Sequence, residues 1–202
     1  MNIKEVKTAF KIADVKLVSG STKLNFVYLE NIRDENGNPL PQSILKQNLA
    51  RVYLIVVDGK IKKIGGSQDA GGIKGTLRIY QDGGIGGRPS IRSFGIWYFL
   101  YHTILQKKKI EFYMIYQENF PKEIKGLFGL HKVRDAFVSY KLLEKCCELD
   151  YKSRESGKHP DWNVQEQAGD WPDEIKMEHS QIMKKSISKK TKKGRKKISF
   201  KK

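Results

Sequence analysis

Residues 51–66, RVYLIVVDGKIKKIGG, decide the fold of this chain. They consist of a run rich in β-branched residues, an Asp-Gly pair and a second apolar run that ends on two glycines. Two such runs around Asp-Gly predict a β-hairpin. The other elements of the chain are expected to pack around it.

Two registers of this hairpin are compatible with its turn residues. A two-residue type I′ turn at Asp58-Gly59 pairs Tyr53 with Ile64, whereas a three-residue loop with Gly59 as a left-handed bulge pairs Tyr53 with Lys63. A slip of one residue moves a side chain to the other face of the sheet. Only the second register would bring the phenol of Tyr53 and the ammonium of Lys63 together on one surface.

The composition is that of a globular protein. The 202 residues, 39% of them hydrophobic and 10% aromatic, are enough for one core. No run approaches the roughly 18 apolar residues of a membrane span, and the N-terminus lacks the apolar segment of a signal peptide. The adjacent Cys146 and Cys147 do not suit a disulfide framework or a zinc site. We therefore expect a cytoplasmic protein without a membrane partner.

The charge is strongly basic and unevenly distributed. Of the formal net charge of +17, eleven Lys and Arg residues lie in residues 184–202, which contain no acidic residue, so +6 remains for the rest. The charge predicts a polyanionic partner, most simply nucleic acid; a solubilising terminus is the alternative. We expect an N-terminal extension over residues 1–50, a folded domain over residues 51–183 and a disordered lysine-rich tail over residues 184–202.

The first fifty residues carry few signals. Val15–Val18 and Leu24–Leu29 are typical of short strands, and Ser43–Leu49 of a short helix. This extension would either contact DNA, support dimerisation or, as the simpler alternative, pack against the main sheet.

A glycine-dense segment, residues 71–90, follows the hairpin. It contains neither of the complete glycine-rich fingerprints of nucleotide-binding loops. Because glycines let a backbone approach a ligand closely, the segment, with Lys74, Arg78, Arg88 and Arg92, predicts a loop that lies along a phosphate backbone. A flexible surface loop is the alternative.

The second half of the chain alternates helix and strand signals. Apolar residues at helical spacing predict a helix over about residues 90–105, and residues 110–116 predict a third strand. A loop with Pro121, Gly126 and Gly129 follows. Asp135 is expected to cap a further helix, which carries Glu144 on a semi-apolar stripe. The buried side of that helix is expected to carry Leu142, Leu143, Cys146 and Leu149.

These features resemble the GIY-YIG nuclease family. Arg51-Val52-Tyr53 stands where the first motif has Gly-Ile-Tyr, and Lys63-Ile64-Gly65 stands where the second has Tyr-Ile-Gly. A glutamate on a helix, followed about twenty residues later by the Pro160-Asp161-Trp162-Asn163 turn, resembles the rest of the pattern. The resemblance spans roughly residues 50–167, and lysine in the second motif is similar to a subset found among type II restriction endonucleases. The residues that follow the family's order are Tyr53, Lys63, Gly65, Arg78, Glu144 and Asn163.

The resemblance implies an α/β (α+β) fold in which about three antiparallel strands are flanked by helices. It also implies a Mg²⁺-dependent, site-specific endonuclease that cuts double-stranded DNA and acts as a homodimer. Glu144 would bind one Mg²⁺ ion, for which Mn²⁺ can substitute, and Asn163 would help to fix the site. A single glutamate suits one metal ion, since Mg²⁺ takes one or two carboxylates and keeps several waters.

The chemistry of phosphodiester hydrolysis gives each residue a role. Tyr53 would be the general base, and Lys63 would favour its phenolate by charge. Arg78 would clamp the scissile phosphate, and Arg88 or Arg92 would do so if the glycine segment folds differently. His102 and His159 have no assigned role. The segment from Trp162 to Trp171 could pack on the body or touch DNA.

Other functions are compatible with the same features. A non-catalytic nucleic-acid-binding protein would also use a basic tail, and a structure-specific DNA repair nuclease could share the fold. Singly, each candidate residue also has an ordinary structural explanation, such as core packing for Tyr53 or a solvent ion pair for Glu144. Cleavage of plasmid DNA with Mg²⁺ separates these functions.

Overall fold

The computed structural model describes residues 1–83, 88–136, 138–167 and 169–198, and gives only the backbone of residues 135 and 186–198. Its centre is one five-stranded antiparallel sheet with the strand order β2-β1-β7-β5-β6. The sheet is larger than the expected three strands, and the α+β class is as predicted. Its strands are β1 (Phe10–Leu17), β2 (Leu24–Tyr28), β5 (Arg51–Val57), β6 (Lys60–Ser67) and β7 (Ile110–Tyr116).

The first fifty residues are joined directly to this sheet. Strand β1 pairs with β7, and β2 pairs with β1 at the edge. The side chains of Ile12, Ala13 and Leu24 are completely buried. The short β3 (Ile32–Arg33), β4 (Pro39–Leu40), η1 (Ile3–Glu5) and η2 (Gln42–Leu45) complete this part.

The β5–β6 hairpin contains a type I′ turn and a bulge. Asp58 and Gly59 have φ angles of 47° and 79°, as a type I′ turn requires. Ile55 is paired with Lys63 but Val56 with Ile61, so one residue of β6 is extra.

That extra residue changes the predicted register. Tyr53 lies opposite Gly65, and neither Ile64 nor Lys63 is its partner, so both expected registers are wrong. Residues directly opposite each other share a face, and every second residue along a strand does too. Lys63 therefore shares the face of Tyr53, as the catalytic interpretation required. The cause is the bulge in β6, which the turn residues alone did not indicate.

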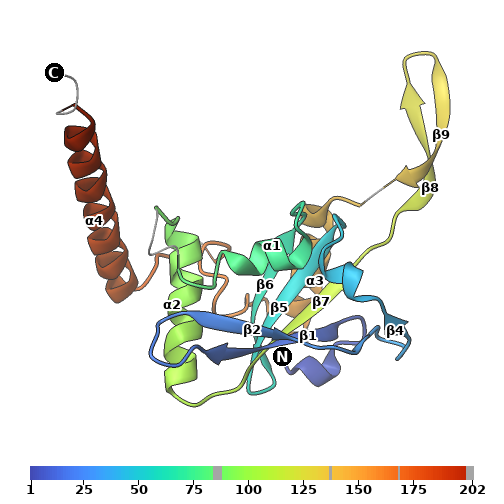
Figure 1. Ribbon diagram of the computed structural model, residues 1–202. Coiled ribbons are helices and arrows are strands. Elements are labelled where there is room, and N and C mark those ends of the chain that lie inside the picture. The colour runs from blue at the N-terminus through green and yellow to red at the C-terminus, as the bar shows by residue number, and fades with distance from the viewer. Residues whose placement is uncertain (84–87, 137, 168, 199–202) are drawn as a thin grey trace.

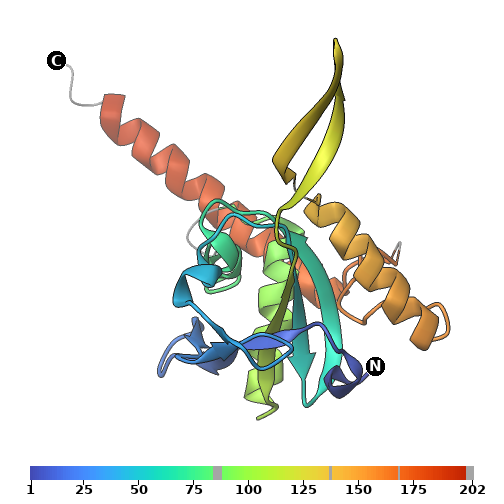
Figure 2. The same ribbon diagram turned by 90° about the vertical axis from the view of Figure 1, so that its right-hand side faces the viewer.

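Helices cover both faces of the sheet (Figures 1 and 2). Helices α1 (Gly72–Arg78) and α2 (Ile91–Leu105) pack on the face that carries Tyr53, around a core that includes Phe94 and Phe112. Helix α3 (Tyr140–Arg154) and η1 cover the other face around Leu54 and Ile64. The expected loop over the first glycines is thus partly a helix, while residues 84–87 lie outside the described residues.

Helix α3 differs from its prediction at its start and on its buried side. Ser139 is its N-cap, and its hydroxyl accepts a hydrogen bond from the Lys141 N–H; residue 135 belongs to a strand instead. Leu142 and Leu149 are 55% and 57% exposed. The residues that pack on the core are Leu143, Cys147 and Tyr151.

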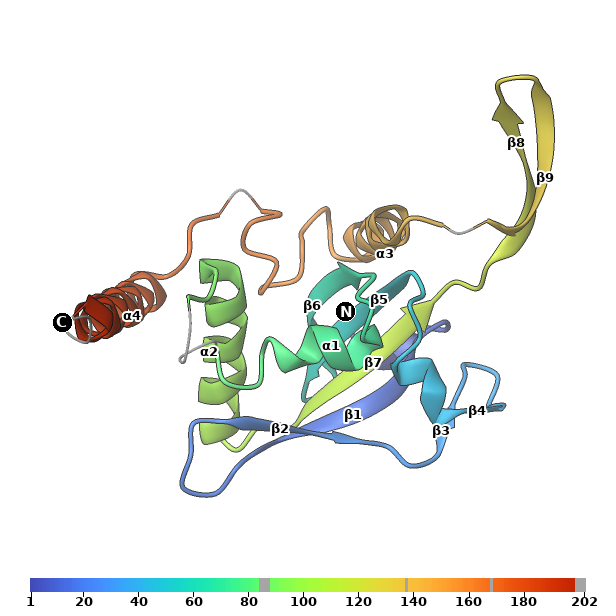
Figure 3. The ribbon, with the colours of Figure 1, turned by 45° about the horizontal axis from the view of Figure 1, so that its top comes forward.

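Two elements project from the body (Figures 1 and 3). Residues expected to form a loop form a hairpin of β8 (Phe120–Gly126) and β9 (Gly129–Ala136). The backbone of helix α4 (Asp173–Ile198) extends past Lys184, into the segment for which a disordered lysine-rich tail was predicted. No helix in the described part of the chain is long and apolar enough to cross a membrane.

The segment before α4 packs on the body. Trp162 stacks on Phe99, with ring centroids 5.3 Å apart. Trp171 is buried against Phe99 and Gly95. Both tryptophans thus belong to the cover of α2.

Candidate active site

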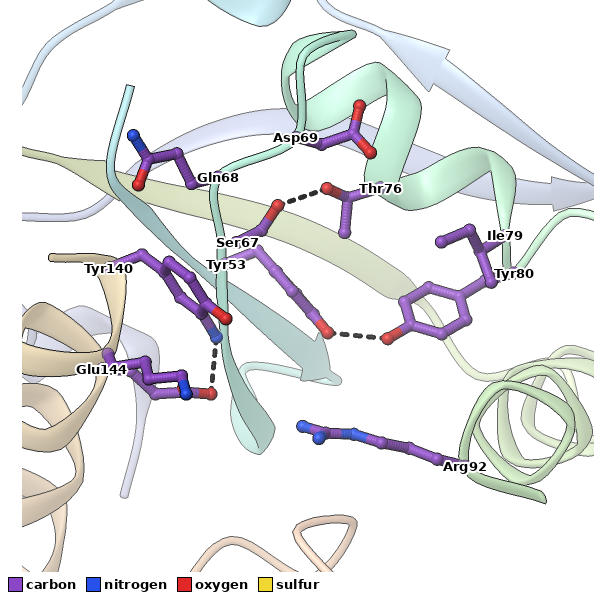
Figure 4. A pocket seen from close by; sticks show the side chains of 12 residues that line it. Tyr53, Ser67, Gln68, Asp69, Thr76, Ile79, Tyr80, Arg92, Tyr140 and Glu144 are labelled. Atoms are coloured by element: carbon purple, nitrogen blue, oxygen red, sulfur yellow. Dashed lines mark hydrogen bonds between the residues drawn. The ribbon is translucent and has the colours of Figure 1, made fainter. Parts of the chain in front are cut away.

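A cavity of about 560 Å³ opens where the end of β6 meets α1, α2 and α3 (Figure 4). Three of its side chains, Tyr53, Arg92 and Glu144, come from distant parts of the sequence and lie around one space. Its lining consists of Tyr53, Gly66, Ser67, Gln68, Asp69, Thr76, Ile79, Tyr80, Arg92, Tyr140, Lys141 and Glu144.

Tyr53 projects from β5 and is held by a second tyrosine. Its hydroxyl lies 2.7 Å from that of Tyr80, and both side chains are buried. Its ring lies directly over Gly65, where a Cβ would approach the ring to 2.5 Å. Glycine is therefore required opposite Tyr53, which explains the Ile-Gly end of the second strand.

Burial raises the pKa of Tyr53 well above its usual value, and Tyr80 raises it further. Arg92 lowers the pKa of Tyr53, while Glu144 raises it. Lys63 was predicted directly opposite Tyr53, but it lies opposite Ile55, one pair further along the same face. Tyr53 is consequently neutral near pH 7 in the free protein, and the positive charge facing it belongs to Arg92.

Glu144 reaches the cavity from the first turns of α3. Its Oε1 accepts a hydrogen bond of 2.5 Å from the Gly66 N–H at the outer edge of β6. A Cβ at Gly66 would lie 2.7 Å from Glu144 Oε2 and 2.9 Å from Tyr140. The second glycine thus lets α3 approach the strand closely enough for Glu144 to line the cavity.

The donors at this site suit a hard cation with few protein ligands. Glu144 supplies carboxylate oxygen, and Oε1 alone is engaged with the Gly66 N–H. Among the described residues, no group of three or more His, Cys, Asp or Glu side chains is arranged to hold a metal ion. One carboxylate with several retained waters is a coordination that Mg²⁺ accepts, so the residues present fit that ion.

Arg92 is the arginine of the cavity. It lies in the first turn of α2, where Ser90 caps the helix by accepting from the Ser93 N–H. Arg92 Nη2 lies 3.1 Å from Glu166 Oε1. Burial lowers the pKa of Arg92, but Glu166 and the tyrosines outweigh it and the pKa is raised. The guanidinium therefore stays charged and is held in place.

The other predicted cations lie elsewhere. Arg78 and Arg88 are exposed and do not line the cavity. Lys74 Nζ lies 4.6 Å from the ring centroid of Tyr28, over the far strand. Arg78 is at the end of α1 and is exposed, so of the three arginines that were candidates for the phosphate clamp, Arg92 is the one that lines the cavity.

Lys63 is almost completely buried, at 1% exposure, and is not part of the cavity lining. Burial lowers its pKa to about 8, against the carboxylates of Glu166, Glu144 and Glu148, which raise the pKa. Arg92 lowers it as well. Lys63 thus contributes a buried positive charge behind the site that begins to be lost just above neutral pH.

This buried lysine predicts a specific pH dependence of stability in metal-free buffer. Below about pH 8, Lys63 is charged in both the folded and the unfolded chain, so burial of its ammonium destabilises the folded chain in full. Above about pH 8, the folded chain loses this proton before the unfolded chain does, and the destabilisation decreases. Lys63→Met should therefore have a higher free energy of unfolding than wild type at pH 7. This difference between the two proteins should decrease by up to about 3 kcal/mol as the pH approaches 10. Urea unfolding of both proteins across this range measures it. An advantage that stays constant with pH would contradict the assignment.

Asn163 acts on the site through the edge of β6. It is completely buried, accepts from the Ile64 N–H at 2.9 Å and donates to the Ile64 carbonyl at 3.0 Å. Its amide also donates to Glu148 Oε1 at 3.2 Å. Together with the Trp162 N–H, which donates to the Lys62 carbonyl, it satisfies an edge that would otherwise expose unpaired backbone groups. Asn163 is thus a positioning residue outside the cavity.

Loss of this amide should be costly to stability. Asn163→Ala leaves the buried Ile64 N–H and carbonyl unpaired, so we expect the free energy of unfolding to fall by about 2–4 kcal/mol. The matched control is Asn48→Ala, at an exposed asparagine, which should change it by less than about 0.5 kcal/mol. Urea unfolding compares the two, and an equal effect would refute the role of Asn163.

Two residues of the site had no role in the sequence interpretation. Tyr80 follows Ile73 and Leu77 at helical spacing, which indicates burial but gives no sign of its bond to Tyr53. Glu166 lies beyond the Asn163 turn, and its partner Arg92 is 74 residues away. Neither contact has a local signal. His102, in contrast, packs on Tyr98 outside the cavity.

Comparison with known proteins gives a likeness of fold. No protein-family model and no curated protein sequence matches this chain. A mutant of bacteriophage T4 EndoII superimposes with a TM-score of 0.50 at 14% identity, covering 81% of this chain and 99% of that one. The restriction endonuclease HPY188I in complex with product DNA gives 0.42 at 21% identity, with 79% and 84% covered. The chain therefore shares the overall fold of a phage endonuclease.

Proposed function

We propose that this protein is a Mg²⁺-dependent endodeoxyribonuclease that cuts double-stranded DNA at specific sites, in the manner of a type II restriction enzyme of the GIY-YIG family. The observation that carries the proposal is the meeting of Tyr53, Arg92 and Glu144 around one cavity. Hydrolysis of a phosphodiester needs a proton acceptor, a cation for the phosphoryl oxygens and an anchor for a metal ion. The endonuclease fold and the net charge of +17 support the same conclusion.

Each side chain of the cavity has a role in this chemistry. Arg92 would bind the scissile phosphate, since Glu166 engages its Nη2 and steadies the guanidinium. Tyr53 would act as the base in its phenolate form, after its hydroxyl proton has left to water through the cavity; the phenolate oxygen, which Tyr80 contacts, would then accept a proton from the attacking water. Burial raises the pKa of Tyr53 and keeps it neutral in the free protein. This role therefore requires the positive charge of Arg92 to lower that pKa.

Glu144 would hold the metal ion, with Mn²⁺ able to replace Mg²⁺. When bound, a divalent cation offsets the charge that develops on the phosphate oxygens. Lys63 would add a positive charge beneath the site, and Asn163 would keep β6 against α3.

We further propose that the active form is a homodimer. Cutting both strands of a duplex is easiest with two active sites related by a two-fold axis. The cavity around Tyr53, Arg92 and Glu144 in each chain would then make one cut per subunit.

Plasmid digestion followed by mapping of the fragment ends tests the function. The proposal predicts discrete fragments with a common end sequence in the presence of Mg²⁺ and intact plasmid in EDTA. Cleavage only at branched DNA would instead indicate a structure-specific repair nuclease. Binding without any cleavage would indicate a non-catalytic nucleic-acid-binding protein.

A further inference from the structure

The β8–β9 hairpin projects away from the central sheet (Figure 1). From Pro121 to Gly126 every side chain of β8 is exposed. At the tip, Leu127 and Phe128 are 95% and 98% exposed, and Leu130 is 63% exposed. An isolated two-stranded hairpin is marginally stable in water at best. This arm therefore has the features of an element that is completed by a partner.

The arm is basic along its length. Its exposed cations are Lys122, Lys125, Lys132 and Arg134. Among the described side chains of the arm, the acidic one is Glu123. In the register, Lys122 lies opposite Val133 and Lys125 opposite Leu130, while Lys132 lies opposite Glu123. None of the four cations makes an ion pair with a described side chain. Their charge is available to an anionic partner.

The composition of the arm favours nucleic acid over a second protein chain. A stable protein interface buries about 800 Å² on each partner around a core that is depleted in lysine. On the arm, the apolar tip is small and the two strands behind it carry lysines. A two-stranded ribbon fits the major groove of DNA, and exposed Leu and Phe side chains flanked by Lys and Arg are the residues that proteins insert against base steps.

The position of the arm agrees with this partner. Helices α1 and α2, which contribute residues to the lining of the cavity, lie between the arm and α4 (Figures 1 and 3). Helix α4 extends on the opposite side from the arm and carries Lys184 and Lys185, which are exposed. A duplex seated at the cavity would therefore run toward a basic projection on each side.

We propose that the β8–β9 hairpin is a DNA-binding arm, whose basic strands lie along a groove of the duplex and whose tip residues Leu127 and Phe128 contact the bases. This inference rests on the proposed nuclease function for the identity of the nucleic acid. It adds a binding element that is separate from the cavity.

Two arm variants of the full-length protein test the proposal. The charge variant combines Lys122→Gln, Lys125→Gln, Lys132→Gln and Arg134→Gln; the tip variant combines Leu127→Ser and Phe128→Ser. The matched control combines Lys4→Gln, Lys7→Gln and Lys108→Gln, at exposed lysines that belong neither to the arm nor to the lining of the cavity. Anisotropy of a labelled DNA duplex in EDTA gives the affinity of each protein as a function of salt concentration.

The two variants should differ in their salt dependence. The charge variant should lose about 10–100-fold in affinity at low salt and reduce the magnitude of the slope of log affinity against log salt by up to about 3.6, because each of four phosphate contacts contributes roughly 0.9. The tip variant should lose about tenfold with an unchanged slope. The control should bind as wild type does, and thermal unfolding should show an unchanged body in all three.

Other outcomes separate this inference from the nuclease proposal. Wild-type cleavage with unchanged DNA affinity in both arm variants would overturn the arm alone. A change from dimer to monomer in the arm variants, measured by light scattering, would overturn it in favour of self-association. Arm-dependent binding without cleavage by wild type would support the arm and refute the nuclease, whereas wild-type protein that neither binds nor cuts DNA would overturn both.

Discussion

Glu144→Gln should lower Mg²⁺-dependent DNA cleavage by about 10³-fold, the scale of removing a principal electrostatic contact from a transition state. Glutamine retains a carbonyl oxygen that can accept the 2.5 Å hydrogen bond from the Gly66 N–H, so the contact between α3 and β6 is kept. The negative charge that would hold the cation is lost. Rates of duplex cleavage at saturating protein measure the effect, and thermal unfolding should show a folded protein.

A neighbouring glutamate supplies the control. Glu148 lies one turn further along α3 and accepts from Asn163, outside the lining of the cavity. Glu148→Gln keeps an acceptor for that amide and should leave most of the cleavage rate. Comparable losses at both positions would contradict the assignment of the metal to Glu144.

Arg92→Ala should lower cleavage by about 10²–10³-fold, because the guanidinium lines the cavity and its charge acts on Tyr53. Arg92→Lys should recover only part of the rate, since an ammonium lacks the planar fork that binds two phosphate oxygens. Single-turnover rates on a duplex substrate measure both variants.

The matched substitution for this prediction is Arg78→Ala. Arg78 follows the family's order in the sequence, but it is exposed at the end of α1. The cleavage rate of Arg78→Ala should stay close to that of wild type. The reverse result, with Arg78 essential and Arg92 dispensable, would show that the cavity described here is not where the phosphate is bound.

The sequence predicts the strands of the central hairpin but not their register. Asp58 and Gly59 form the expected type I′ turn. The bulge beyond it coincides with contacts from a distant segment: Lys62 Nζ lies 2.6 Å from Asp161 Oδ2, and the Lys62 carbonyl accepts from the Trp162 N–H. Since these contacts join residues about a hundred positions apart, turn chemistry alone could not reveal them.

The projecting elements show the limits of local patterns in the same way. Gly126 and Gly129 flank Leu127-Phe128, a pair without the residues that normally mark a two-residue hairpin turn. Because β8 is exposed along nearly its whole length, its sequence does not need the alternation of apolar and polar residues by which strands are recognised. In α1, two glycines in seven residues conceal a helix that tertiary packing of Ile73 and Leu77 stabilises.

The sequence could predict those residues of the candidate site that follow the order of the family's motifs along the chain. Tyr53 and Glu144 line the cavity, as proposed from their place in the motif order, and Asn163 supports it from behind. Arg92 and Tyr80 depend on how α1 and α2 fold onto the sheet. The spacing of residues in the sequence does not favour Arg92 or Tyr80 over Arg78.

The most direct test of the central claim is the conversion of supercoiled plasmid by wild-type and Glu144→Gln proteins that are purified identically. We predict that wild type linearises the plasmid with Mg²⁺ and leaves it intact in EDTA, while Glu144→Gln leaves it intact in both. Equal cleavage by the two proteins, or DNA binding by wild type without any cleavage in Mg²⁺ or Mn²⁺, would contradict the claim that this cavity hydrolyses DNA.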